Sequence, residues 1–233
     1  CLPADPLIRL GFLLVLLTPC IDYVVTFSQI GRADSRLLLA ATPVLLILQL
    51  LLLPAYLGVF LGSHAEGLIQ LGPFVHAFVW LIAVPLVLAG VLQIAARHTQ
   101  AGQRVADGLG LSPVPATALV LFVVVGAVVP QLQSALGAAA LVLPLYIAFA
   151  CVAPLLGWLV SRWFGLEPSA RRAVAFSAST RNSLVVLPLG LAVPGAIPIL
   201  PAIIVTQTLV ELVSELVYMR VMPKLGREAG EAY

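Results

Sequence analysis

The residues best suited to chemistry in this sequence form a polar cluster inside an apolar stretch near its start. Thr18, Pro19, Cys20 and Asp22 lie together between Leu-rich and Val-rich segments. Proline removes a backbone hydrogen bond, so an unwound segment would let Cys20 and Asp22 face one pocket, which their two-residue spacing prevents on a regular helix. A thiolate binds thiophilic ligands, and a carboxylate this deep in an apolar segment usually serves function. The alternative for Cys20 is a small buried apolar residue.

A second polar cluster interrupts an apolar stretch much further along the chain. Thr180, Arg181, Asn182 and Ser183 stand directly before the sequence Leu-Val-Val-Leu-Pro-Leu. An arginine at membrane depth costs several kcal/mol, so such a residue is usually paired and faces a water-filled cavity. The alternative is that Arg181 snorkels to the interface or lies in a cytoplasmic half-loop.

The last apolar stretch carries three polar residues on one helix face. Gln207, Glu211 and Glu215 recur every four residues, which predicts a polar stripe. Glu211 is the candidate carrier of a proton or a cation, because a desolvated carboxyl group can bind and release a proton near neutral pH. Glu215 has the alternative of lying close to the cytoplasmic interface.

Other polar residues carry weaker signals. Thr42, Gln49 and Tyr56 form a stripe that hydrogen bonds between helices explain equally well. Cys151 has no polar neighbour in its apolar run and is assigned to packing. The three histidines have no spacing typical of metal ligands. No metal and no cofactor is therefore predicted.

Composition determines which elements must position these residues. The chain is 61% hydrophobic and 9% charged with a mean hydropathy of +1.12, whereas soluble domains are about 25% charged. Runs such as 37–61 are long enough to cross about 30 Å of hydrocarbon as helices, which alone satisfy their own backbone amides in lipid. We therefore expect an all-α transmembrane bundle. A formal charge of +2 does not suggest a nucleic-acid partner, so the expected partners are the lipid bilayer and a small-molecule substrate.

Hydropathy and loop charge predict the membrane topology. The predicted spans are residues 7–30, 37–61, 73–96, 112–133, 138–162, 173–193 and 197–221. Basic residues gather in alternate loops, whereas the loops 62–72, 134–137 and 194–196 contain none. The positive-inside rule then predicts a multi-pass protein of the cell membrane with its C-terminus in the cytoplasm and residue 1 outside.

The two polar clusters are related by a candidate internal repeat. At an offset of 162 residues, four polar positions fall on polar positions: Thr18 on Thr180, Cys20 on Asn182, Gln49 on Glu211 and Tyr56 on Tyr218. The first and sixth spans cross in opposite directions, as in inverted-repeat transporters with discontinuous helices. Matches this sparse also arise by chance. A repeat of this length predicts that about 90 further residues, enough for three spans, precede residue 1.

Three motifs in this chain resemble the bile acid:sodium symporter superfamily, and most closely its arsenical-resistance branch of arsenite efflux carriers. The motifs are Thr18-Pro19-Cys20 with Asp22, Thr180-Arg181-Asn182-Ser183, and Gln207-Thr208-Leu209-Val210-Glu211-Leu212. The resemblance covers essentially the whole chain and implies the fourth to tenth helices of a ten-helix fold. It implies core-domain segments at 1–61 and 138–221 with two crossing broken helices, panel-domain helices at 72–133 and a cytoplasmic tail at 222–233.

The resemblance also implies roles for individual residues. Cys20 corresponds to the thiol required in arsenite carriers, and Glu211 to their essential carboxylate. Arsenous acid is uncharged at physiological pH and thiophilic, and one thiol would bind it reversibly. Arg181 could stabilise the Cys20 thiolate or pair with Asp22 or Glu211. Sodium-coupled members carry a Glu and a Gln where this chain has Ser177 and Arg181, and a guanidinium among the sodium ligands argues for proton coupling.

The leading hypothesis is therefore a secondary active transporter, a proton-coupled efflux carrier for arsenite or a related small oxyacid. Its predicted substrate site is Cys20, Asp22, Arg181, Asn182 and Glu211, supported by Thr18, Pro19, Gln49, Thr180, Ser183 and Gln207. The nearest alternative is a sodium-coupled symporter of organic anions. An intramembrane enzyme is disfavoured, because the sequence lacks a paired Gly-Asp motif, a His-Glu-x-x-His helix and a nucleophile elbow.

Overall fold

The computed structural model describes residues 3–20, 23–61, 76, 79–110, 112–191, 193 and 195–226. Helices account for 85% of the structure, and the described residues contain no β-strand, which confirms the all-α prediction. Within those residues, three helical segments are long and apolar enough to cross a membrane: Ser35–Leu53, Ala135–Trp163 and Ile199–Lys224. Large apolar side chains such as Val44, Leu155 and Val213 are exposed on them. These long apolar helices indicate a membrane protein.

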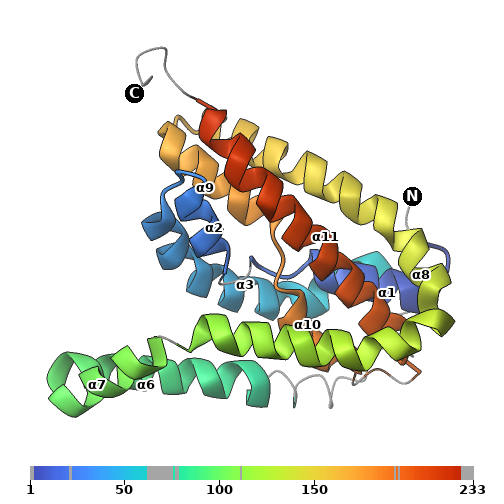
Figure 1. Ribbon diagram of the computed structural model, residues 1–233, viewed down its shortest axis with the longest axis horizontal. Coiled ribbons are helices and arrows are strands. Elements are labelled where there is room, and N and C mark those ends of the chain that lie inside the picture. The colour runs from blue at the N-terminus through green and yellow to red at the C-terminus, as the bar shows by residue number, and fades with distance from the viewer. Residues whose placement is uncertain are drawn as a thin grey trace.

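The helices follow one another in the order α1 (Pro6–Leu16), α2 (Val24–Ile30), α3 (Ser35–Leu61), η2 (Val79–Ala83), α6 (Val84–His98), α7 (Gln100–Gly110), α8 (Pro113–Trp163), α9 (Pro168–Ser179), α10 (Ser183–Leu191), α11 (Ile199–Val221) and η3 (Met222–Lys224). Figure 1 shows α1, α2, α9, α10 and α11 gathered beside the later part of α8. Helices α6 and α7 pack against each other and lie at the lower edge of the view.

Local capping chemistry fixes where several of these helices begin. The Asp5 Oδ1 atom accepts hydrogen bonds from the backbone amides of Leu7 (2.8 Å) and Ile8 (3.1 Å) at the start of α1. Asp34 does the same for α3, accepting from Arg36 and Leu37, each at 3.1 Å. Each cap satisfies amides that a helix start leaves without partners.

Helix α8 differs from the prediction, because the loop expected at residues 134–137 does not interrupt it. The helix continues through 51 residues, which as a straight rod would measure about 75 Å, more than twice the thickness of the hydrocarbon layer. Figure 1 shows it changing direction sharply between a green arm and a yellow arm. Ala135, Leu136 and the alanines that follow are strong helix formers, which explains the continuous hydrogen bonding.

Two of the expected spans are interrupted, in agreement with the polar clusters that occupy them. The stretch 7–30 consists of α1 and α2, and the stretch 173–193 consists of α9 and α10. The stretches 37–61 and 197–221 correspond to α3 and α11, and the described part of 73–96 is η2 and α6. The basic segment expected as a loop before residue 112 instead forms α7. The seven-span inverted-repeat architecture stays a prediction, as do the core, panel and tail assignments.

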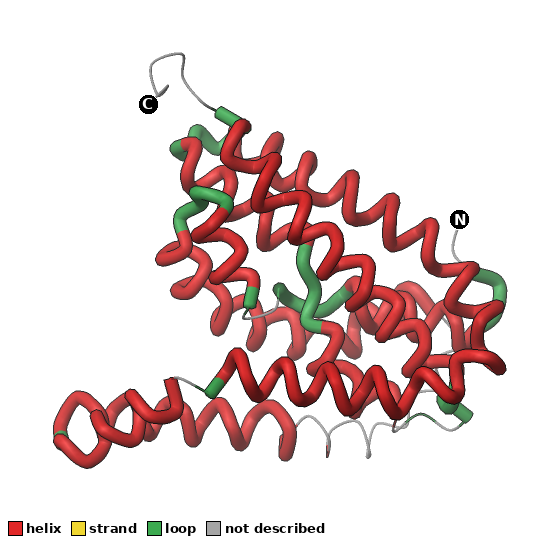
Figure 2. Tube along the Cα trace, viewed as in Figure 1, coloured by secondary structure: helices red, strands yellow, loops and turns green. Residues whose placement is uncertain are grey.

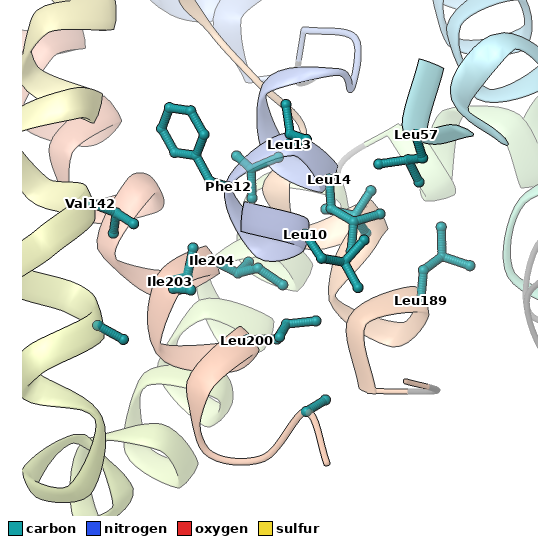
Figure 3. Packing of buried hydrophobic residues seen from close by; sticks show 14 of the residues in the cluster. Leu10, Phe12, Leu13, Leu14, Leu57, Val142, Leu189, Leu200, Ile203 and Ile204 are labelled. Carbon is teal, nitrogen blue, oxygen red and sulfur yellow. The ribbon is translucent and has the colours of Figure 1, made fainter. Parts of the chain in front are cut away.

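The apolar core lies where α1 crosses α11. Figure 3 shows Leu10, Leu13 and Leu14 of α1 packed near Ile203 and Ile204 of α11, and all five are buried. Val142 of α8 and Leu189 of α10 complete this cluster. Because lipid tails are as apolar as these side chains, close packing contacts hold such helices together in a membrane.

Candidate functional site

The two helix interruptions meet at the centre of the molecule. The backbone amide of Asn182, between α9 and α10, donates a hydrogen bond of 2.7 Å to the carbonyl of Pro19, between α1 and α2. Figure 2 shows loop segments meeting here among the helices. The Thr18 hydroxyl donates to the Val15 carbonyl at 2.6 Å, and the Thr180 hydroxyl donates to Phe176 at 3.0 Å. Both threonines thus satisfy carbonyls that the helix ends leave free.

Asn182 and Ser183 restart the second interrupted helix. The Asn182 Oδ1 atom accepts from the amide of Val185 at 3.3 Å, an N-cap arrangement for α10. The Ser183 and Thr208 hydroxyls lie 2.7 Å apart, which joins the start of α10 to α11. Asn182 and Ser183 therefore have local structural partners as well as a position at the centre of the molecule.

The Arg181 guanidinium binds carbonyl oxygens at the ends of both first half-helices. Its Nε donates to Leu16 of α1 at 2.9 Å, and its Nη1 donates to Thr180 at 2.7 Å and to Ser177 at 3.4 Å. The guanidinium also lies 4.8 Å from the ring centroid of Phe149 on α8. Helix C-termini carry partial negative charge, so a cation between two of them is electrostatically favourable.

Glu211 connects both interruptions through its carboxylate. Its Oε1 accepts from the Tyr23 hydroxyl at 2.6 Å, beside the first break. Its Oε2 accepts from the backbone amide of Arg181 at 2.6 Å, within the second break, and from Gln207 Nε2 at 2.6 Å. The residue is only 3% exposed. Short bonds of this kind stabilise the charged form of a carboxylate, whereas burial disfavours it, and Glu211 is the side chain that connects the two breaks.

Cys20 is buried beside two hydroxyl groups, and it lines a cavity together with Arg181. The Ser177 hydroxyl donates to its Sγ at 3.4 Å, and the Thr42 Oγ1 lies 3.7 Å from the same sulfur. A cavity of about 480 Å³, within the usual range for small-molecule sites, adjoins it. Its lining residues are Cys20, Leu37, Leu38, Ala41, Leu45, Gln49, Leu166, Ala173, Val174, Ser177, Ala178 and Arg181.

Most residues expected at the site do lie together. Contacts or a shared cavity link Pro19, Cys20, Gln49, Thr180, Arg181, Asn182, Gln207 and Glu211. The hydrogen bonds of Thr18 and Ser183 are instead with Val15 and Thr208. Asp22 lies outside the described residues. Tyr56 is 38% exposed and does not line the cavity. No group of three or more His, Cys, Asp and Glu side chains suited to a metal occurs in the part of the chain described.

Sequence reasoning missed Tyr23, and it noted Ser177 only as a departure from a family pattern. Tyr23 directly follows the first polar cluster, so its position next to a break was a usable signal. Thr42 appeared only in a weak stripe, because its contact with Cys20 joins residues of different helices. Phe149 lies in an apolar run that gives no sign of the guanidinium above its ring.

The fold and this buried centre define the class of the protein. Its long apolar helices and two interrupted helices, joined through a half-buried Arg and a buried Glu, make it an all-helical membrane protein. Comparison with models of protein families finds no match, and no curated protein matches the chain.

Proposed function

We propose that the protein is a secondary active carrier that exports arsenite or a related small oxyacid across the cell membrane in exchange for protons. It would belong to the arsenical-resistance branch of the bile acid:sodium symporter superfamily, whose motifs it resembles. The observation that carries the proposal is the bond between Asn182 and Pro19, which joins two helix breaks beside a thiol and a cavity. Carriers of inverted-repeat type build their substrate sites from such discontinuous helices.

The surroundings of Cys20 support a thiophilic substrate. In binding, the thiol sulfur would form a bond to arsenic, while the thiol proton and one hydroxyl of arsenous acid leave together as water. Thr42 and Ser177 stand close to the sulfur and could hydrogen bond the remaining hydroxyls. A single thiol makes one such bond, which water can reverse, and this suits a carrier that must release its cargo.

The surroundings of Glu211 and Arg181 support proton rather than sodium coupling. Carbonyl oxygens of unwound half-helices are the ligands that bind coupling cations in transporters, but here the Arg181 guanidinium already occupies three of them. Protonation of Glu211 would weaken its bonds to both Tyr23 and Arg181, one at each break. A proton on Glu211 would therefore loosen the contact between the two helix breaks. Alternating access to the two sides of the membrane requires such a change.

A sodium-coupled symporter of organic anions is the second candidate, and one observation favours it. The cavity beside Cys20 is walled mainly by aliphatic side chains and carries one cationic residue, Arg181. Such a lining would suit an apolar molecule with one carboxylate. The carbonyl contacts of Arg181 weigh against it, because they occupy much of its hydrogen-bonding capacity.

Everted membrane vesicles from an efflux-deficient host test the two candidates. We expect vesicles carrying the full chain to accumulate arsenite when their interior is acidified, whether or not sodium is present. Cys20→Ser should abolish this uptake, and Cys151→Ser should preserve it because Cys151 is exposed on α8, away from the break. Sodium-dependent transport of an organic anion, unaffected by Cys20→Ser, would instead support the second candidate.

A further inference from the structure

Glu215 is a buried carboxyl group that the site described above does not use. It is 0% exposed, and among the described residues neither of its oxygens has a hydrogen-bond partner. It lies one helical turn beyond Glu211 on the same face of α11, with the Cβ atoms of such a pair about 5–6 Å apart. The two carboxyl groups therefore share an electrostatic environment but differ entirely in their partners.

This difference in partners assigns different charge states to the two residues. Glu211 accepts three hydrogen bonds, which stabilise a carboxylate anion. A buried carboxylate without donors costs several kcal/mol, so Glu215 is stable here as the neutral acid. Two carboxyl groups this close also disfavour a second negative charge. These two arguments favour a proton on Glu215 rather than on Glu211.

Among the described residues, the titratable groups within electrostatic reach of Glu215 are two phenols and the neighbouring carboxyl group. Tyr23, at the start of α2, lies within electrostatic reach of both Glu215 and Glu211, and Tyr218 lies within reach of Glu215. The Tyr218 hydroxyl donates to the Ala150 carbonyl on α8. The Tyr218 side chain also belongs to an apolar cluster that includes Val24 of α2 and Phe176 of α9.

We propose that Glu215 is a second proton-binding residue that exchanges a proton with Glu211 and carries it toward the C-terminal end of α11. The inference rests on the proposed proton-coupled function and identifies the next carrier on its proton pathway. Release of the Glu215 proton leaves a carboxylate there, and a proton taken up by Glu211 then passes to it. One proton moves from one carboxyl group to the other, and the Tyr23 phenol, which donates to Glu211, ends the step unchanged.

Proteoliposomes containing the full chain separate proton release from substrate binding. We expect Glu215→Gln to keep arsenite exchange across a membrane without a pH gradient and to lose accumulation driven by a gradient. Glu167→Gln should retain both, because Glu167 is exposed between α8 and α9. Wild-type coupling in Glu215→Gln, or loss of exchange together with accumulation, would overturn the inference. If the wild-type protein moved no arsenite, the proposed function would fail. Infrared spectroscopy would then still test whether Glu215 binds a proton.

Two readouts that need no transport complete the test. The infrared carbonyl band of a protonated carboxylic acid should be present in the wild-type protein and lost in Glu215→Gln, and an unchanged band would contradict the inference. Glu215→Leu should raise the thermal unfolding midpoint in detergent, because it replaces an unpartnered buried carboxyl with an apolar side chain. A structural role for Glu215 would lower that midpoint instead.

Discussion

Arg181 is the residue on which the local electrostatics of the site depend. Its guanidinium joins the carbonyl ends of α1 and α9, while its backbone amide binds Glu211. The sequence left open whether the guanidinium stabilises the Cys20 thiolate or pairs with Asp22 or Glu211. In the structure the contact with Glu211 comes from the backbone, because the break after α9 turns the amide of Arg181 toward α11. One residue therefore carries both the positive charge and the link to Glu211.

Removal of the Arg181 charge should leave carbonyl oxygens that a cation can bind. We expect Arg181→Gln to lower the free energy of unfolding by about 1–3 kcal/mol, because buried acceptors lose a charged donor. Sodium should restore part of this loss in the variant and have no effect on the wild type. Differential scanning fluorimetry in sodium and in choline buffers measures the effect. Arg220→Gln is the control, since Arg220 is exposed and bonds only within its own helix turn; equal responses in both variants would contradict this account.

The Tyr23 hydroxyl should contribute to stability only while Glu211 is ionised. It donates to Glu211 Oε1 at 2.6 Å, and hydrogen bonds to charged groups contribute about 1.5–3 kcal/mol. We expect Tyr23→Phe to lower the unfolding midpoint at neutral pH, with a smaller difference at acidic pH where Glu211 binds a proton. Tyr56→Phe should have little effect, because Tyr56 is partly exposed away from the site. A difference independent of pH would argue against an ionised Glu211.

At the scale of elements, the close approach of α8 to α9 positions the second break. A Cβ atom added at Gly157 of α8 would lie 2.9 Å from the Ala178 Cβ and 3.1 Å from the Ala175 Cα on α9. Only a glycine allows the two backbones to come this close. Ser177, whose hydroxyl contacts the Cys20 sulfur, lies between Ala175 and Ala178 on α9.

Gly157→Ala should therefore disturb the site from a distance. We expect it to destabilise the protein by about 1–3 kcal/mol through overpacking and to reduce transport by shifting Ser177 away from Cys20. Gly137→Ala on the same helix is the matched control, because nothing lies within 4 Å of a Cβ added there. Thermal midpoints and arsenite uptake of the two variants make the comparison. Equal behaviour would mean that α9 is not held by this contact.

The sequence predicted the interrupted elements better than their contacts. The breaks at Pro19 and at Thr180 were predictable, because proline and runs of polar residues end helices through local chemistry. The loop at 134–137 was predicted wrongly, since Ser134 and Gly137 are typical of turns while the alanines beside them favour a helix. Contacts such as that of Tyr23 with Glu211 join residues far apart in sequence, and no local pattern encodes them.

At the scale of the whole molecule, the interrupted pair α9–α10 determines the topology. If it spans the bilayer, residues before α9 and after α10 lie on opposite sides, which the positive-inside rule assigns as cytoplasm and exterior. Composition predicted an all-helical membrane protein from hydropathy alone. The seven spans and their inverted repeat remain predictions, because the described helices long enough to cross a membrane number three.

Cysteine accessibility tests this topology directly. In a chain with its native cysteines replaced by serine, Glu167→Cys and Ile197→Cys introduce thiols at exposed positions on either side of α9–α10. We expect a membrane-impermeant maleimide to label position 197 in intact cells, and position 167 only in everted vesicles. Labelling of both positions from one side would show that α9 and α10 form a re-entrant hairpin.

The central claim is that two helix breaks bring Cys20 and Ser177 to one cavity. Oxidative cross-linking tests it in membranes, using Ser177→Cys in a Cys151→Ser background, because the Ser177 hydroxyl lies 3.4 Å from the Cys20 sulfur. We predict that mass spectrometry of the oxidised protein finds a disulfide between positions 20 and 177, with none between Cys20 and Cys151 in the unmodified chain. Failure of positions 20 and 177 to link, with both thiols intact, would contradict the account.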